Sequence, residues 1–299
     1  MTFAGTGLHT GAEVHMSVHP ASAEYGIWFR RTDIEDKDAL IPARWDAVSD
    51  TLLCTRISNA DGVSVSTVEH ILAALAGCGV HNALIEIDGP EAPLLDGSAA
   101  HFVAAFLARG LMMLDAPVYA IEVLKPVSVS TDQAFASLEP ADHLTIDFHI
   151  EFADAVIGRQ DKSLNMANGA FVHELCDSRT FCRKSDIDAM RDQGLIVGGD
   201  LSSAVVVDGD TVVTPGGMRH ADEPVRHKML DALGDLALAG APILGHYTGH
   251  RAGHGITNSL LRELFSDPSA YRIVQCDSDK AAALPGAGLQ RSDRPELVA

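Results

Sequence analysis

The sequence predicts an α+β protein made of two domains of related architecture. In each half of the chain, strand-like segments come first and apolar helices follow, which is the order of an α+β fold. The length of 299 residues is sufficient for one large domain or two medium ones with cores of their own. Residues 111–117 have the character of a linker, so we place the domains at residues 1–117 and 118–299.

The first half contains three strand-like segments and two apolar helices. Strands are predicted, from alternating or continuous apolar residues, at residues 13–19, 26–29 and 82–87. Helices are predicted from near Ser66 to Gly77 and Gly79, and from Ala99 to Arg109 before Gly110. Residues 32–45 are polar and are predicted to be irregular.

The second half repeats the order of strands followed by helices. Strands are predicted at residues 119–129 and 143–152, and in the apolar runs LIV, AVVV and TVV of residues 195–213. Helices are predicted at residues 184–193, 225–238 and 257–265. The last residues, 290–299, have the composition of a disordered tail.

The bulk composition excludes several classes of protein. A net charge of -19 argues against nucleic-acid binding and against attachment to anionic membranes. No apolar stretch is long enough for a transmembrane segment, and the first residues lack the pattern of a signal peptide, so we expect a cytoplasmic protein. The five cysteines include no CxxC pair, which makes a disulfide framework or a cysteine zinc site improbable.

The segment RHKMLDALGDL carries the strongest local signal. His227, Asp231 and Asp235 are spaced four apart, so a helix places them on one face. The rest of that helix is apolar, and a buried stripe of this kind needs partners. Imidazole and carboxylate groups at this spacing are good zinc ligands. The competing interpretation is an ordinary hydrogen bond between His227 and Asp231, with Asp235 as a surface charge.

A second signal is STVEHILAALAG, at the start of the first helix. Glu69 and His70 could supply a general base and a metal ligand within one turn. Ser66 and Glu69 also have the spacing of a capping box, so Glu69 could instead bond back to the start of the helix. His70 could equally be an ordinary half-buried histidine.

Three further segments carry weaker signals. HYTGHRAGHG places His246, His250 and His254 in a predicted glycine-rich loop, where His254 lies between two glycines and a ligand could approach closely. SRTFC offers the hydroxyl of Thr180. GTGLHTG lacks the Gly-Lys-Ser/Thr ending of a nucleotide-triphosphate loop, so we interpret it as a glycine turn between strands.

Taken in this order, GLHTG, STVEHILAALAG, PLLDGSA, SRTF, RHKMLDALGDL and GHGITNSLL resemble the UDP-3-O-acyl-N-acetylglucosamine deacetylase family. The resemblance runs over nearly the whole chain. It implies a zinc-dependent deacetylase that performs the committed step of lipid A synthesis in Gram-negative bacteria. It also implies a monomer whose substrate is UDP-3-O-acyl-N-acetylglucosamine.

The resemblance assigns a role to individual residues. It implies one zinc ion per chain, held by His70, His227 and Asp231. It implies that Glu69 is the general base, His254 the catalytic histidine, Asp235 its support and Thr180 a hydroxyl that helps to hold the oxyanion. It implies contacts to the substrate diphosphate from Lys228 and Arg251, and to the uracil from Phe152. A site with two histidines and one aspartate also accepts iron or cobalt, so Fe²⁺ is an alternative metal.

The implied fold is two related β-α-α-β two-layer sandwiches, each with a small insert, and an active site between the helix layers. The second insert, near residues 191–210, would form an apolar passage for the acyl chain. The chain departs from the family pattern in three ways. Fewer residues precede GLHTG than is usual in the family. Ala134 replaces a lysine of some members. Pro224 and Arg183 occupy positions that are usually aromatic or apolar.

The expected mechanism follows from these roles. Zinc with three protein ligands retains a water whose pKa lies near 7. Glu69 would take a proton from it, and His254, kept charged by Asp235, would protonate the leaving amine. Two alternatives stay open: a zinc amidase for another acylated amino sugar, and a non-catalytic protein stabilised by zinc.

Overall fold

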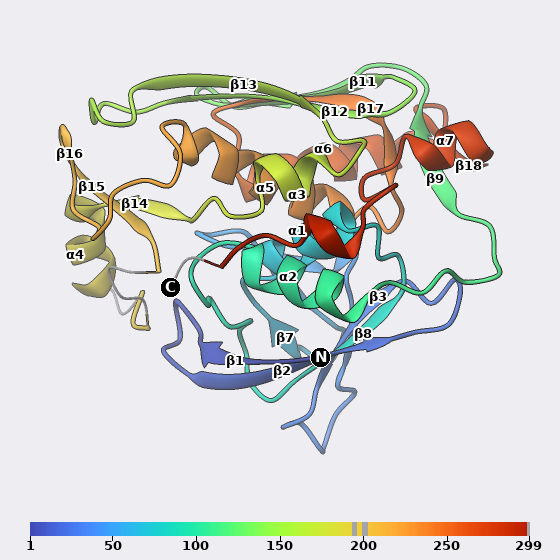
Figure 1. Cartoon of the computed structure of the whole chain (residues 1–299), viewed down its shortest axis with the longest axis horizontal. Helices are drawn as coiled ribbons and strands as arrows, with labels where there is room; N and C mark the ends of the chain where they lie inside the picture. Colours follow the sequence, from blue (N-terminus) through green and yellow to red (C-terminus); the bar gives the residue numbers. More distant parts are fainter. Residues whose placement is uncertain (193–195, 199–202, 298–299) are drawn as a thin grey trace.

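The protein has four layers, with two β-sheets on the outside and helices between them (Figure 1). The computed structural model describes residues 1–192, 196–198 and 203–297. The first sheet comes from the N-terminal part of the chain, and the second from residues beyond Tyr119. The prediction of an α+β fold, with helices covering one face of each sheet, is therefore confirmed.

The first sheet is five-stranded. Its order is β1 (Thr2–Thr6), β2 (Glu13–Pro20), β8 (Ala83–Ile87), β3 (Ile27–Arg31) and β4 (Leu40–Pro42). The predicted strands are confirmed, whereas β4 lies inside the stretch predicted to be irregular, because its three residues are too few for a periodic pattern. A small sheet follows, with β5 (Val48–Asp50), β6 (Arg56–Ser58) and β7 (Ser64–Val65).

The second sheet is seven-stranded. Its main path is β10 (Val127–Ser130), β11 (Phe135–Pro140), β17 (Ile243–His250), β12 (Leu144–Glu151) and β13 (Arg159–Asn165), and β9 (Tyr119–Val123) and β18 (Tyr271–Gln275) extend it beside β17. Strand β17 contains His246 and His250, and His254 is the first residue of helix α6 (His254–Ser266), so the prediction that these three histidines lie in a loop is wrong. Alternation of buried and exposed residues fits a strand there, but the glycines of the segment concealed it.

A second small sheet lies at one end of the molecule beside helix α4 (Lys184–Asp192). It comprises β14 (Phe181–Arg183), β15 (Val205–Asp208) and β16 (Thr211–Val212). The AVVV run is thus a buried strand as predicted. Ile196 and Val197 of the LIV run belong to no strand, and Leu195 lies outside the described residues.

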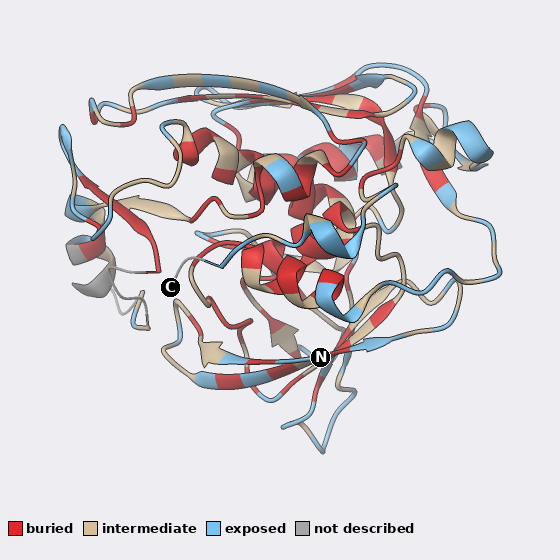
Figure 2. Cartoon of the chain, in the orientation of Figure 1, coloured by how far each residue is buried: buried red, intermediate tan, exposed pale blue. Residues whose placement is uncertain are grey.

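The inner layers contain the longer helices. These are α1 (Glu69–Gly77), α2 (Ala100–Arg109), α5 (Glu223–Ala237) and α6 (His254–Ser266). Two short helices, α3 (Ala170–Glu174) and α7 (Ser278–Ala282), complete the set, with 3-10 turns at Trp45–Ala47 and Arg291–Asp293. Buried residues concentrate on these inner helices and on the sheet faces that cover them (Figure 2).

Helices α1 and α5 pack directly against each other at the centre of the molecule. Their close approach depends on Gly234, because a Cβ atom at this position would lie 2.1 Å from the carbonyl oxygen of Glu69. Glu69 and His70 begin α1, while His227 and Asp231 lie on α5. The contact between the two helices therefore brings the predicted ligands from both halves of the chain together.

The C-terminal segment differs from the prediction of a disordered tail. A 3-10 turn at Arg291–Asp293 lies against the body, where the Arg291 guanidinium donates a hydrogen bond to the carbonyl oxygen of Arg109 at 3.1 Å. Residues 298 and 299 lie outside the described part. Among the described residues, no helix is long and apolar enough to span a membrane.

Candidate metal and catalytic site

His70, His227 and Asp231 form a buried cluster between α1 and α5. One ligand atom from each lies within 4.8 Å of the others, a spacing suited to a single metal ion. Nε2 of His70 and Nε2 of His227 lie 3.6 Å and 3.3 Å from the same Asp231 oxygen, Oδ1. That oxygen is buried and accepts no hydrogen bond. A buried carboxylate oxygen without a donor, facing two imidazole nitrogens, fits a divalent metal ion.

His227 is held in one orientation by the backbone. Its Nδ1 lies 3.0 Å from the carbonyl oxygen of Ser178, which can only accept, so Nδ1 carries the proton. Nε2 is then free to bind a metal. Burial lowers the pKa of His227 to about 4, against the opposing effect of Asp231. The imidazole is consequently neutral at physiological pH, as a metal ligand must be.

Asp231 is ionised despite its burial. Burial alone would raise the pKa of this carboxyl, but His227 and Lys228 hold it well below its usual range. The Lys228 ammonium donates a hydrogen bond to Asp231 Oδ2 at 2.8 Å. Lys228, which we predict to contact the substrate diphosphate, thus lies directly beside a metal ligand.

Glu69 lies next to His70 and faces a third histidine, His254. Its Oε2 accepts a hydrogen bond from the backbone N–H of Thr55 at 3.0 Å, and Oε1 lies 3.9 Å from Nε2 of His254. The capping-box interpretation is wrong, because no side chain caps α1 and the Ser66 hydroxyl donates to the carbonyl of Pro90 instead. Burial raises the pKa of Glu69. The carboxylate is therefore a stronger base than an exposed glutamate.

His254 and Asp235 form a close buried pair. Nδ1 of His254 lies 2.8 Å from Asp235 Oδ2, while Asp235 Oδ1 accepts a hydrogen bond from the Thr55 hydroxyl at 2.6 Å. Burial lowers the pKa of His254, but Asp235 and Glu69 outweigh it and raise the pKa to about 9. The imidazole is therefore positively charged at neutral pH, with Nε2–H directed to the Glu69 side.

Thr180 lies on the segment beside His227, and Phe152, which follows β12, contacts that segment through Phe181. Thr180 follows Arg179 directly, and its backbone N–H donates to the carbonyl of Gly97 at 2.8 Å. The Phe152 ring packs edge-on against Phe181, with centroids 5.4 Å apart, and Phe181 in turn lies 6.5 Å from the His227 ring.

Arg251 directly follows β17 and lies three residues before His254, the first residue of α6. Its side chain is exposed, its φ is +51°, and its backbone N–H donates to the carbonyl of His149 at 2.8 Å. Within the described part of the chain, no ion pair involves its guanidinium, so its charge is available to a ligand.

Three of the positions that depart from the family pattern have clear local structures. Pro224 occupies the first turn of α5, where its missing N–H breaks no helical hydrogen bond. Arg183 forms an ion pair with Asp154, and Ala134 closes the turn between β10 and β11 by accepting from the Thr131 N–H.

Cavity size alone would not have located this site. An apolar cavity of about 1160 Å³ lies at the opposite ends of α1 and α5, lined by residues such as Leu75 and Leu236 and by the linker at Met112. None of the predicted site residues lines it. The chemistry of the side chains, rather than the depth of a pocket, identifies the site.

Sequence analysis missed several residues that support the site. Glu91 is fully buried and accepts hydrogen bonds from the backbone N–H groups of His9 and Thr10 and from the Thr67 hydroxyl. Thr67 has φ +56°, a rare conformation for a β-branched residue, directly before α1. Sequence analysis could not identify Glu91 or Thr55 as site residues, because their hydrogen-bond partners lie elsewhere in the chain and neither residue belongs to a recognisable motif.

Comparison with known proteins identifies the family of the chain. A sequence model of the family "UDP-3-O-acyl N-acetylglycosamine deacetylase" matches residues 1–266. The chain is 45% identical to the UDP-3-O-acyl-N-acetylglucosamine deacetylase of Phenylobacterium zucineum over 282 residues, covering 94% of this chain and 96% of the relative. Identity to the proteins of the same name from Pseudoalteromonas atlantica and Myxococcus xanthus is 41% and 42%, covering 92% and 95% of this chain and 91% and 89% of those proteins. The chain therefore belongs to the UDP-3-O-acyl-N-acetylglucosamine deacetylase family.

Proposed function

We propose that this deacetylase hydrolyses the N-acetyl group of UDP-3-O-acyl-N-acetylglucosamine and releases acetate and the free amine. The observation that supports this most directly is the buried pair Glu69 and His254 beside the cluster of His70, His227 and Asp231. A site that only binds a structural metal has no need of a base and a charged histidine next to the ligands. By its family, the reaction belongs to lipid A biosynthesis.

The proposed cofactor is one zinc ion, held by His70, His227 and Asp231. When bound, the metal lowers the pKa of a water molecule and polarises the amide carbonyl. Two imidazoles and one carboxylate are a typical ligand set of a catalytic zinc site, and Fe²⁺ is the alternative metal.

Glu69 is the proposed general base. Its pKa is raised by burial, so the carboxylate can take a proton from the attacking water more readily than an exposed glutamate. The hydrogen bond from the Thr55 N–H fixes the orientation of its second oxygen. The base is thus held in position before the substrate arrives.

His254 is the proposed acid. It carries a proton at neutral pH because Asp235 and Glu69 lie beside it, and that proton would pass to the leaving amine. Its positive charge, together with the Thr180 hydroxyl, would stabilise the developing oxyanion. Asp235 holds the ring through Nδ1 and leaves Nε2–H for the reaction.

The substrate contacts remain proposals drawn from the resemblance. Phe152 would stack on the uracil, and Lys228 and Arg251 would lie near the diphosphate. The acyl chain would enter along the insert near residues 191–210, part of which lies outside the described residues. The monomeric state and the cytoplasmic location also stay predictions.

The direct test measures metal content and acetate release from UDP-3-O-acyl-N-acetylglucosamine, for the wild type and for Asp231→Ala. We expect about one zinc per chain and turnover in the wild type, and loss of both in the variant. A protein that binds metal but leaves this substrate intact would point to another acylated amino sugar. Full turnover by Glu69→Ala would contradict the role of Glu69.

A further inference from the structure

The N-terminal end of α5 contains a fully buried carboxylate that the proposed reaction does not use. Glu223, the first residue of α5, is 0% exposed. Its Oε1 accepts from the backbone N–H of Arg179 at 3.0 Å and from Nε of the same side chain at 2.9 Å. Its Oε2 accepts from Arg179 Nη2 at 3.2 Å and from the Arg219 N–H at 2.6 Å. Both oxygens are therefore fully occupied by donors.

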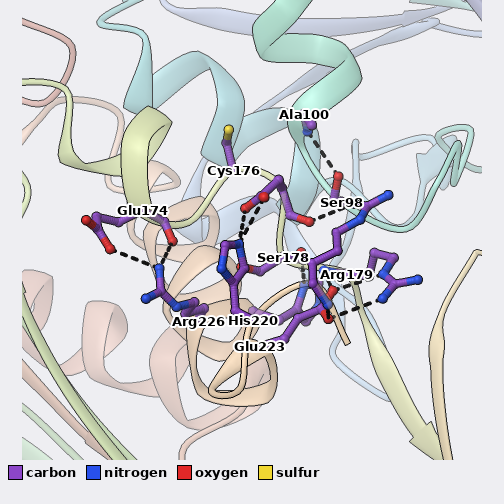
Figure 3. A network of polar contacts seen from close by, with 12 residues as sticks. Ser98, Ala100, Glu174, Cys176, Ser178, Arg179, His220, Glu223 and Arg226 are labelled. Atoms are coloured by element: carbon purple, nitrogen blue, oxygen red, sulfur yellow. Dashed lines mark hydrogen bonds and ion pairs between the residues drawn. The ribbon is translucent and has the colours of Figure 1, made fainter. Parts of the chain in front are cut away.

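The Arg179 guanidinium is equally constrained. It engages Glu223 through two nitrogens and donates from Nη2 to the carbonyl of Gly217 at 2.7 Å. A bidentate pair of this kind fixes orientation as well as charge, which a lysine cannot do. Figure 3 shows Glu223 and Arg179 side by side, with Ser178 next to them.

The backbone on either side of Arg179 connects the pair of Glu223 and Arg179 to the proposed metal ligand His227. On one side, Ser178 is fully buried, and the Ser178 carbonyl accepts the hydrogen bond from Nδ1 of His227. The neighbour on the other side is Thr180. Because Glu223 binds both the backbone N–H and the side chain of Arg179, it holds the segment that carries both groups.

Helix α5 provides a second connection between Glu223 and His227. Glu223 lies four residues before His227, so both project from the same side of α5, one turn apart. Glu223 thus extends the stripe of His227, Asp231 and Asp235 by one turn toward the N-terminus of α5. The position of His227 is consequently set both by α5 itself and by the segment that Glu223 anchors.

We propose that Glu223 and Arg179 are positioning residues for the metal site, in that they fix the Ser178 carbonyl and so the tautomer and orientation of His227. The inference rests on the proposed metal ligands. A purely structural ion pair would stabilise the fold equally with and without metal, whereas a positioning pair also raises affinity for the metal.

The test titrates metal-free protein with Zn²⁺ against a competing chelator and repeats the titration with Co²⁺, whose visible spectrum reports the ligand geometry. We expect Glu223→Gln to weaken metal binding about 10- to 100-fold. Arg179→Lys should weaken it too, because it retains the charge but loses the bidentate geometry. The matched control is Asp222→Asn, which breaks ion pairs to Arg226 and Lys162 at the adjacent position and should leave affinity unchanged.

Thermal unfolding of metal-free and metal-loaded protein separates the two roles. Breaking a buried ion pair also destabilises the fold, so Glu223→Gln is compared by how much metal raises its melting temperature, and Arg179→Lys serves if that variant does not fold. If Arg179→Lys binds metal as tightly as the wild type, or if metal raises the melting temperature of the variants as much as that of the wild type, this inference fails while the proposed function stands. A wild type that binds no metal would overturn the proposed function together with it.

Discussion

His254 shows how strongly neighbours can set the properties of one side chain. Burial alone would make it neutral, yet it lies between carboxylates of two helices and its pKa rises to about 9. The charged and titratable groups around it are Asp235 and Asp231 from α5, Glu69 and His70 from α1, and His9 from the turn after β1.

Replacing Asp235 by Asn should lower the pKa of His254. Since the proposed acid must be protonated, the wild type should lose activity as pH rises through about 9, and Asp235→Asn should lose it at lower pH. The measurement is the pH profile of kcat/KM for both proteins. An unchanged basic limb would show that His254 is not the group that titrates there.

Replacing Glu69 by Gln removes a base without removing a metal ligand. We expect kcat to fall on the order of 10²- to 10⁴-fold while metal content stays the same. Steady-state kinetics and metal analysis on the same preparation provide the check. If metal is lost together with activity, Glu69 contributes to the metal site rather than to proton transfer.

Among the site residues, some positions could be predicted from local spacing along a helix and others depend on tertiary contacts. The i, i+4 spacing of His227, Asp231 and Asp235 was sufficient to place them on one face, since helix geometry fixes it. His254 and Glu69 come together only through the tertiary contact between α1 and α6 with α5, which no local spacing encodes. The capping-box interpretation of Glu69 failed because Thr55, from a distant loop, binds that carboxylate instead.

At the scale of elements, the contact between α1 and α5 determines the geometry of the site. Gly234→Ala places a methyl group about where the Glu69 carbonyl oxygen lies. Alanine ordinarily stabilises a helix relative to glycine by about 1 kcal/mol. Here we expect instead a loss of about 1–3 kcal/mol from overpacking, together with reduced activity. Chemical denaturation and turnover measure both, and a more stable variant would contradict the close approach.

The elements themselves were predictable to different degrees. Long apolar helices such as α5 and α2 have a strong periodic pattern, so their predicted bounds agree with the structure to within a few residues. β4 was missed and β17 was mistaken for a loop, because one is very short and the other contains glycines. The 3-10 turn at Arg291–Asp293 was missed because its residues have the composition of a disordered tail, although a capping box between Gln290 and Asp293 supports it, as does the contact with α2.

At the scale of the whole molecule, the proposed metal ligands come from both parts of the chain. A metal held by His70 and by Asp231 would join them, so its removal should destabilise the fold. At free metal 100 times above Kd, the expected loss on chelation is about 2.7 kcal/mol. Calorimetry with and without chelator tests this, and Asp231→Ala should show no such difference.

The division into residues 1–117 and 118–299 makes a separate prediction. The linker at 111–117 is exposed, with Met113 92% accessible, and it contains no helix or strand. Limited proteolysis should therefore cut there first. The fragments should remain associated, because α1 and α5 stay packed together. First cleavage at another position, identified by mass spectrometry, would contradict the proposed boundary.

The sharing of ligands between distant parts of the chain has a consequence for synthesis on the ribosome. Asp231 follows His70 by 161 positions, and His254 comes later still. At about 5–20 residues per second, the nascent chain takes roughly ten to thirty seconds to pass from one ligand to the other. During that interval a single exposed histidine cannot retain an ion. With His70, His227 and Asp231 as the metal ligands, the nascent chain would therefore bind the ion only after Asp231 has been added, and it would be inactive until then.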